Sequence, residues 1–172
     1  MPKFPTLASC LIASLCAIGV AAQRGIDFSG SWVLDETQVR PDPDIPQRLV
    51  VEQSLTTTTT PSGAPLPPAY HTLYVKRYVG NDVQQEAHRI GLIGGSVNGV
   101  PGPAGGSGYE VTWRGDSLWI YRETYGPGGA NIRRRGETWR IDDLGRLVIT
   151  IESREAAEPT TTQTLAYLRD KP

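Results

Sequence analysis

The sequence predicts an all-β domain, and two features carry that prediction. Segments of about five to ten residues, rich in aromatic and β-branched side chains, follow one another between glycine- and proline-containing turns. No window of useful length keeps its apolar residues at helical spacing, and the best candidate, residues 134–147, is interrupted by Gly136 and Gly145. A run of hairpins without Greek-key crossovers favours an antiparallel up-and-down β-barrel, which removes the exposed edges of an open sheet. A β-sandwich is the alternative.

Residues 1–22 have the pattern of a secretory signal peptide. Lys3 gives a positive start, residues 7–22 are uncharged and mostly apolar, and small residues at 20–22 suit signal cleavage. The apolar run is shorter than the ~20 residues of a membrane-spanning helix, although a retained anchor is the alternative. We therefore expect an exported protein, periplasmic or extracellular, with a single domain over residues 23–172 and no stable membrane insertion after cleavage.

Nine strands are predicted in the mature chain, and turn chemistry separates them. The proline-rich segment 40–47 cannot continue a helix, and hairpin turns are expected at 80–82, 114–116 and 142–145. The glycine-rich segment 90–108 reads as a long loop, which is either a simple connector or a lid at the mouth of the barrel. The predicted strands cover residues 31–35, 48–55, 69–79, 83–90, 108–113, 117–125, 131–141, 146–153 and 160–169.

Composition excludes several classes of function. Both cysteines, Cys10 and Cys16, lie within the predicted signal peptide, so the mature chain has no disulfide, thiolate metal site or cysteine nucleophile. The 17 Lys and Arg residues nearly balance the 18 Asp and Glu residues, and no basic field favours nucleic acid. We find no motif for a cofactor and expect none, because no phosphate-binding glycine loop with its Lys-Ser/Thr pair occurs.

The stretch FSGSWVLD, residues 28–35, resembles the Gly-x-Trp element on the first strand of lipocalins. The order of the strands resembles that of small exported bacterial lipocalin-like (calycin-type) domains, in which a proline-containing turn leads to an LxVEQ-like strand, here residues 49–53. The resemblance covers roughly residues 27–170, but a C-terminal helix and a second lipocalin motif are missing. Later parts of the pattern are GDSLWI, GETWRI, GRLVITIES and TQTLAYLR.

The resemblance also implies a structural role for three residues. In that family the tryptophan, here Trp32 after Gly30, packs across the closed end of the barrel, and an arginine from late in the chain lies over it. Arg169 is the positional match, and a guanidinium can stack on an indole face. The alternative is that Arg169 is a solvated surface residue.

Candidate catalytic residues are few. His71 and His88 are expected on neighbouring strands, with His71 nearly opposite Arg89, so the two imidazoles would be near neighbours on the same face or on opposite faces. Two histidines without a third ligand make a poor metal site, and no metal is expected. A structural or surface role is favoured for both, although a catalytic role in a barrel-hosted enzyme remains an alternative.

The arginine-rich strand 131–141 is the strongest indication of a ligand. Arg133 and Arg135 share strand parity with Glu137 and Trp139, so all four are expected to face inward. An interior arginine needs a carboxylate or an anionic ligand, and carriers related to this fold place interior arginines on a ligand carboxylate. The alternative is that these arginines project near the rim, where charge is well solvated.

Taken together, these features predict an exported small-molecule carrier. Its ligand would be a small hydrophobic or amphipathic molecule, and the arginines would suit an anionic group on it. A barrel-hosted isomerase, cyclase or hydrolase, and an envelope interaction module with a filled core, are the two alternatives.

Overall fold

The computed structural model describes residues 26–37, 42–56, 60–63, 70–91, 96–98 and 106–170. The predicted signal peptide, residues 1–22, lies outside these ranges, as does most of the predicted loop 90–108.

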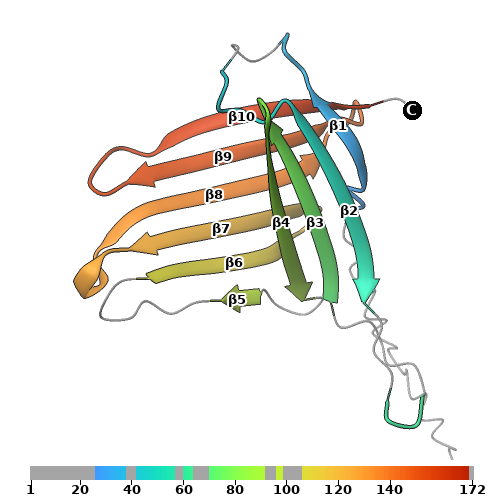
Figure 1. Ribbon diagram of the computed structural model, residues 1–172, viewed down its shortest axis with the longest axis horizontal. Helices are drawn as coiled ribbons and strands as arrows, with labels where there is room; N and C mark the ends of the chain where they lie inside the picture. Colours follow the sequence, from blue (N-terminus) through green and yellow to red (C-terminus); the bar gives the residue numbers. More distant parts are fainter. Residues whose placement is uncertain are drawn as a thin grey trace, which may run out of the picture.

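Ten strands form one sheet in which every strand is antiparallel to its neighbours (Figure 1). Their order is β4-β3-β2-β1-β10-β9-β8-β7-β6-β5, so the chain runs up and down through the sheet, and β1 joins the two halves by pairing with both β2 and β10. The strands are β1 (Gly30–Leu34), β2 (Arg48–Thr56), β3 (Tyr70–Val79), β4 (Asp82–Gly91), β5 (Ser96–Asn98), β6 (Gly106–Arg114), β7 (Ser117–Tyr125), β8 (Asn131–Ile141), β9 (Leu147–Glu155) and β10 (Thr161–Arg169).

The sheet curls into a nearly closed barrel. Strands β2 to β4 cross steeply over β6 to β10, and β4 comes against β5 and β6, so the two ends of the sheet meet (Figure 1). The far ends of β7 to β10 project beyond this crossing, which leaves their inner face open on one side (Figure 1). The predicted antiparallel up-and-down barrel is therefore confirmed, and the arrangement is compatible with a lipocalin-like fold.

All nine predicted strands are present, and the structure adds one. The three-residue strand β5 lies inside the segment that we predicted as a loop, and it pairs with β6. The sequence did not predict this strand because a short stretch within a glycine-rich segment shows too little alternation of polar and apolar residues. Among the described residues the helical content is one 3₁₀ turn, Pro127–Gly129. No helix in the described ranges is long and apolar enough to cross a membrane.

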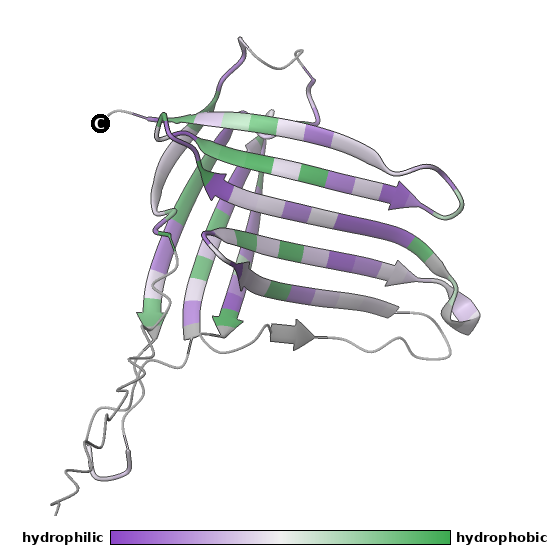
Figure 2. Cartoon of the chain, turned by 180° about the vertical axis from the view of Figure 1, so that it is seen from behind, coloured by the Kyte–Doolittle hydropathy of each residue, from purple (hydrophilic) through white to green (hydrophobic). Residues whose placement is uncertain are grey.

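Large apolar side chains fill the end of the barrel where the two halves cross. Phe28 stacks on Trp113 with ring centroids 5.9 Å apart and meets Trp139 edge-on at 6.0 Å. Trp32 is fully buried, and its indole nitrogen donates to the carbonyl oxygen of Phe28 at 2.9 Å. Apolar residues gather at this crossing, and polar ones lie toward the projecting ends of β8 and β9 (Figure 2).

Arg169 covers the buried Trp32 at this filled end. Its guanidinium carbon lies 4.7 Å from the centre of the indole ring, and the two residues are register partners in β10 and β1. Gly30 adopts φ +139°, a region that side chains rarely enter, and a Cβ there would lie 3.5 Å from Nη1 of Arg169. The backbone conformation of Gly30 thus brings the start of β1 close beneath the Arg169 guanidinium.

Candidate functional site

The inner face of the barrel changes from apolar to charged along several strands. On β3 the inward residues Leu73 and Val75 are followed by Arg77, and on β7 the inward residues Leu118 and Ile120 are followed by Arg122. The strands β4 and β8 carry the same pattern in the reverse chain direction. The charged ends of all four runs meet in the interior, and we call this group the interior charge cluster. It consists of Arg77, Glu86, His88, Tyr109, Arg122, Arg135 and Glu137.

Glu137 on β8 is one centre of this cluster. Its side chain is 1% exposed, and Oε2 accepts hydrogen bonds from Nη2 of Arg77 at 2.8 Å and from Nε1 of Trp139 at 3.0 Å. Oε1 accepts from Nε of Arg135 at 3.1 Å and lies 3.6 Å from Nη1 of Arg122. A buried carboxylate is stable only when its lone pairs and charge are compensated, and three hydrogen-bond donors together with the nearby charge of Arg122 do this here.

Glu86 on β4 is the second centre. Its Oε2 accepts from Nη2 of Arg122 at 2.7 Å and lies 3.7 Å from Nη2 of Arg77. Nε2 of His88 comes within 3.2 Å of the same oxygen but falls short of hydrogen-bond geometry, while Nδ1 of His88 contacts the hydroxyl of Tyr109. Arg77 and Arg122 are therefore shared between two carboxylates, which ties the β3–β4 hairpin to β7 and β8 across the interior.

The arginines hold both carboxyl groups in the ionised form. Burial alone would raise the pKa of Glu137, but the charges of Arg77 and Arg135, with hydrogen bonds from Arg77 and Trp139, lower this pKa to about 2. Burial would likewise raise the pKa of Glu86, and the adjacent His88 together with Arg77 and Arg122 lowers it to about 2. Both glutamates are thus anions at neutral pH.

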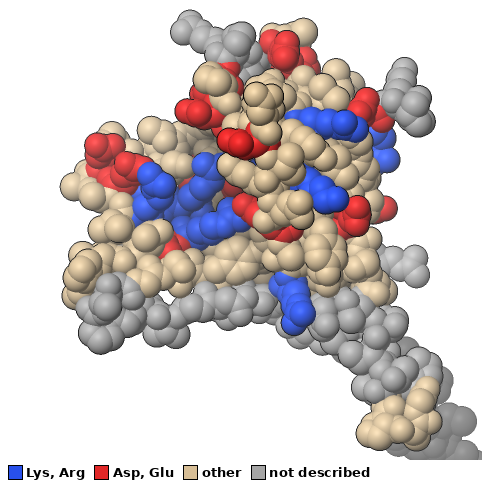
Figure 3. Space-filling view, in the orientation of Figure 1, with Lys and Arg blue, Asp and Glu red and all other residues tan. Residues whose placement is uncertain are grey.

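A cavity of about 300 Å³ opens beside this cluster. Blue arginine side chains gather over β7 and β8 beside β4, on the side where the barrel is open (Figure 3). Three arginines, two glutamates and Asp44 are the charged residues of the lining, so its charges balance overall. Arg77 and Glu137 are buried, whereas the side chains of Arg122 and Arg135 are 31% and 41% exposed. The cavity is lined by Asp44, Pro46, Arg77, Val79, Gln84, Glu86, Arg122, Arg135 and Glu137.

Several guanidinium N–H groups at the cavity lack a protein acceptor. Nε of Arg77 is buried and has no hydrogen-bond partner among the described residues, although the side chain is only 7% exposed. Arg135 donates through Nε to Glu137, and no described residue accepts from its two terminal nitrogens. An unpaired buried donor costs about 1–3 kcal/mol, which applies to Nε of Arg77. The terminal nitrogens of Arg135, whose side chain is 41% exposed, are available to an acceptor in the cavity.

The four residues predicted as the ligand-binding lining do not all reach the cavity. Arg135 and Glu137 line it, and Trp139 lies beneath it, fully buried, with its indole donating to Glu137. Arg133 shares their face of β8, but its side chain is 64% exposed and pairs with Glu155 on the projecting end of the sheet. The predicted inward parity therefore holds for the strand, while Arg133 lies past the point where the opposing strands cover it.

Both histidines face the interior. His71 pairs with Ile90 rather than with Arg89, a shift of one residue in the predicted register that puts both imidazoles on the inner face. His71 is half-buried, 3.4 Å from the side-chain amide of Gln53 and edge-on to Trp113, and burial lowers its pKa. Within the described ranges no group of three or more His, Cys, Asp or Glu residues could hold a metal ion.

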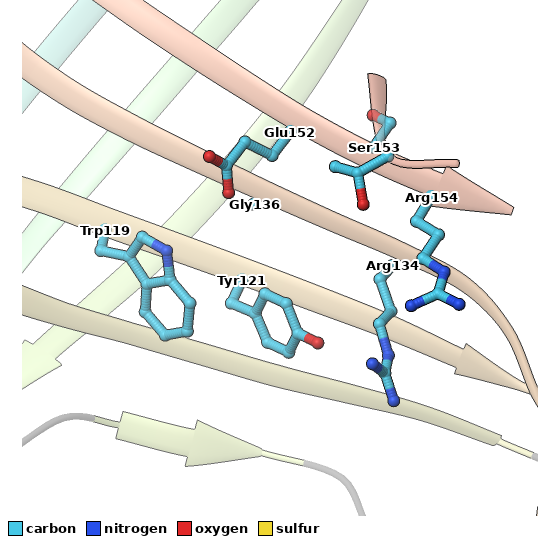
Figure 4. Close-up of a pocket in the computed structure, with 8 residues that line it drawn as sticks. Trp119, Tyr121, Arg134, Gly136, Glu152, Ser153 and Arg154 are labelled. Atoms are coloured by element: carbon cyan, nitrogen blue, oxygen red, sulfur yellow. The ribbon is translucent and has the colours of Figure 1, made fainter. Parts of the chain in front are cut away.

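A second, smaller hollow of about 170 Å³ lies on the outer face of the sheet (Figure 4). Its floor is Gly136, where a Cβ would lie 3.6 Å from the indole nitrogen of Trp119 and 3.8 Å from the ring of Tyr121. Trp119 and Tyr121 stack with centroids 4.9 Å apart, and the Arg114 guanidinium covers Trp119 at 3.6 Å. Aromatic rings packed over a strand glycine are a stabilising feature of sheets, which accounts for this hollow.

Sequence reasoning missed Arg77, Glu86, Tyr109 and Arg122 as members of the site. The signal was present for Arg77, Tyr109 and Arg122, because each continues an alternating run of inward apolar residues on its strand, and Glu86 shares its parity with His88 and Ile90 on β4. The same parity argument that selected the arginines of β8 would have selected them. Which of these runs end at the same place in space depends on strand register and on the crossing of the two halves.

Comparison of the chain with protein-family models, with curated proteins and with solved structures finds no match.

Proposed function

We propose that this protein is an exported, lipocalin-like barrel that binds a small organic anion in the interior cavity. Arg77, Arg122 and Arg135 would hold the anion. The observation that carries this proposal is the cavity wall with three arginines, which exceed by one charge the two glutamates that they contact, and among them Arg77 has a buried Nε without a partner in the described residues. A carboxylate suits this wall because a guanidinium offers parallel N–H donors that match the two carboxylate oxygens.

The packing of the barrel favours a ligand that is mostly polar. The apolar end is occupied by fully buried side chains, including Trp32, Leu49 and Trp139. The cavity is at the lower end of the ~300–1,000 Å³ range of ligand pockets, and its apolar lining is limited to Pro46 and Val79. The sequence suggested a partly apolar ligand. The small, mostly polar cavity favours instead a small molecule with an anionic group.

A barrel-hosted enzyme is the second candidate, and the contacts of His88 favour it. The Tyr109 hydroxyl, the His88 imidazole and the Glu86 carboxylate lie in sequence, an arrangement that can move a proton. Neither Tyr109 nor His88 is among the residues that line the cavity, so a substrate there would not meet the hydroxyl. Binding is therefore the better supported function.

The proposal is tested by calorimetric titration of the purified protein with short carboxylates, alongside native mass spectrometry before and after organic extraction. Arg135→Gln removes cavity donors, and Arg133→Gln, two residues away on the same strand, is the matched control. Arg135→Gln loses charge-assisted hydrogen bonds worth about 1.5–3 kcal/mol, so its affinity for the carboxylate is expected to fall roughly tenfold or more. The affinity of Arg133→Gln is expected to stay within about twofold of the wild type. Absence of binding by any carboxylate, or equal loss in both variants with intact thermal unfolding, would overturn the proposal.

A further inference from the structure

Asp44 stands at the exposed edge of the same cavity, on the turn that leads into β2. This turn is fixed to the barrel at three adjacent residues. Ile45 is 5% exposed, the carbonyl of Pro46 accepts from the Tyr167 hydroxyl at 3.1 Å, and the backbone N–H of Gln47 donates to the carbonyl of Tyr78 at 2.9 Å. The position of Asp44 at the cavity edge is thus set by the packing of its neighbours.

The Asp44 carboxylate makes no ion pair with any described residue. Its backbone N–H donates to the side chain of Asp42 at 2.9 Å, which forms the turn and leaves the Asp44 carboxylate available. Three arginines line the cavity, but each is paired with Glu86 or Glu137 instead. The exposed edge therefore carries a negative charge without an ion-pair partner, while the three arginines and two glutamates of the inner wall carry one excess positive charge.

A ligand with one carboxylate would compensate only the positive half of this arrangement. It would leave Asp44 unpaired, and the negative field of Asp44 would oppose the approach of a simple anion. A simple cation would be repelled by the arginines that line the cavity. A molecule that carries both charges meets the arginines at one end and Asp44 at the other, and the lining with its ligand stays neutral overall.

We propose that the ligand is a small zwitterion with a carboxylate and an ammonium group, such as an amino acid. This inference depends on the proposed function, since it assigns the second group of the same ligand. The carboxylate meets the guanidinium groups of Arg77 and Arg135 on the cavity wall, and the ammonium group lies at Asp44. The side-chain amide of Gln84, which also lines the cavity, can donate to or accept from the intervening atoms.

The test compares ligands that differ only in the ammonium group. Propionate, β-alanine and ethylammonium are titrated calorimetrically into the full-chain protein, into Asp44→Asn and into Asp143→Asn, an exposed turn aspartate that does not line the cavity. An ion pair at the exposed Asp44, worth about 0.2–1 kcal/mol, corresponds to a preference of about 1.5- to 5-fold for β-alanine over propionate. This preference is expected in the wild type and in Asp143→Asn, and it is lost in Asp44→Asn while propionate affinity is retained or increased. Ethylammonium does not bind.

The outcomes separate this inference from the proposed function. Binding of propionate without any advantage for β-alanine, or an advantage that survives Asp44→Asn, overturns the zwitterion and leaves anion binding intact. Glycine and 4-aminobutyrate, titrated in the same way, fix the charge separation that the cavity prefers. If none of the carboxylates binds, anion binding fails and the zwitterion fails with it.

Discussion

Replacing Glu137 with glutamine is the sharpest test of how the interior is held together. The substitution keeps the shape of the side chain and removes a charge that is 1% exposed. Arg77, 7% exposed, then keeps only Glu86 at 3.7 Å, and the new amide places N–H groups against the donors of Arg135 or Trp139. Removing one partner of a buried ion pair costs about 3–5 kcal/mol. For a domain of this size that corresponds to a fall in Tm of roughly 6–20 °C.

The assay is urea and thermal unfolding of Glu137→Gln, with Glu155→Gln as the matched control on an exposed pair. Glu155 is 56% exposed and bonds Arg133, so its substitution is expected to cost less than about 1 kcal/mol. Adding Arg77→Met to Glu137→Gln removes the uncompensated guanidinium and should recover part of the loss. A Glu137→Gln protein whose unfolding free energy lies within 1 kcal/mol of wild type would refute the reasoning, since the cluster would then be hydrated rather than buried.

Two further predictions concern pH and backbone strain. Both Glu86 and Glu137 have a folded-state pKa of about 2, below the ordinary value of 4.5, so the unfolded chain takes up protons first as the pH falls. The stability contributed by the cluster is complete above about pH 4.5 and is lost as the pH falls toward 2. Urea unfolding between pH 7 and 3 should show this fall in the free energy of unfolding. A wild-type free energy that falls with pH no more steeply than that of Glu137→Gln would contradict the prediction. Gly30→Ala forces a side chain into φ +139° and should cost about 1–3 kcal/mol, whereas Gly108→Ala, which needs no such conformation, stays within about 0.5 kcal/mol. Equal melting temperatures for these two variants would rule out strain at Gly30.

Alternation and turn chemistry predicted the fold because they are local properties of the chain. In an antiparallel sheet with one buried face, successive side chains point to opposite sides, so the run Trp139, Glu137, Arg135 identified an inward face of β8 without any knowledge of its neighbours. Glycine- and proline-rich turns marked where each strand ends. The short strand β5 was not predicted because its three residues give no local indication that they pair with β6.

The sequence by itself determined the antiparallel strands, the inward face of each one and the need of interior arginines for anionic partners. Only the tertiary structure decided which charges meet. Arg77 and Glu137 are 60 residues apart in the chain and 2.8 Å apart in space, because β3 crosses the inner face of β8. The same crossing leaves Arg133 uncovered and exposed, although its parity is that of Arg135. Parity is a property of one strand, whereas burial and charge pairing depend on how the two halves of the sheet lie across each other.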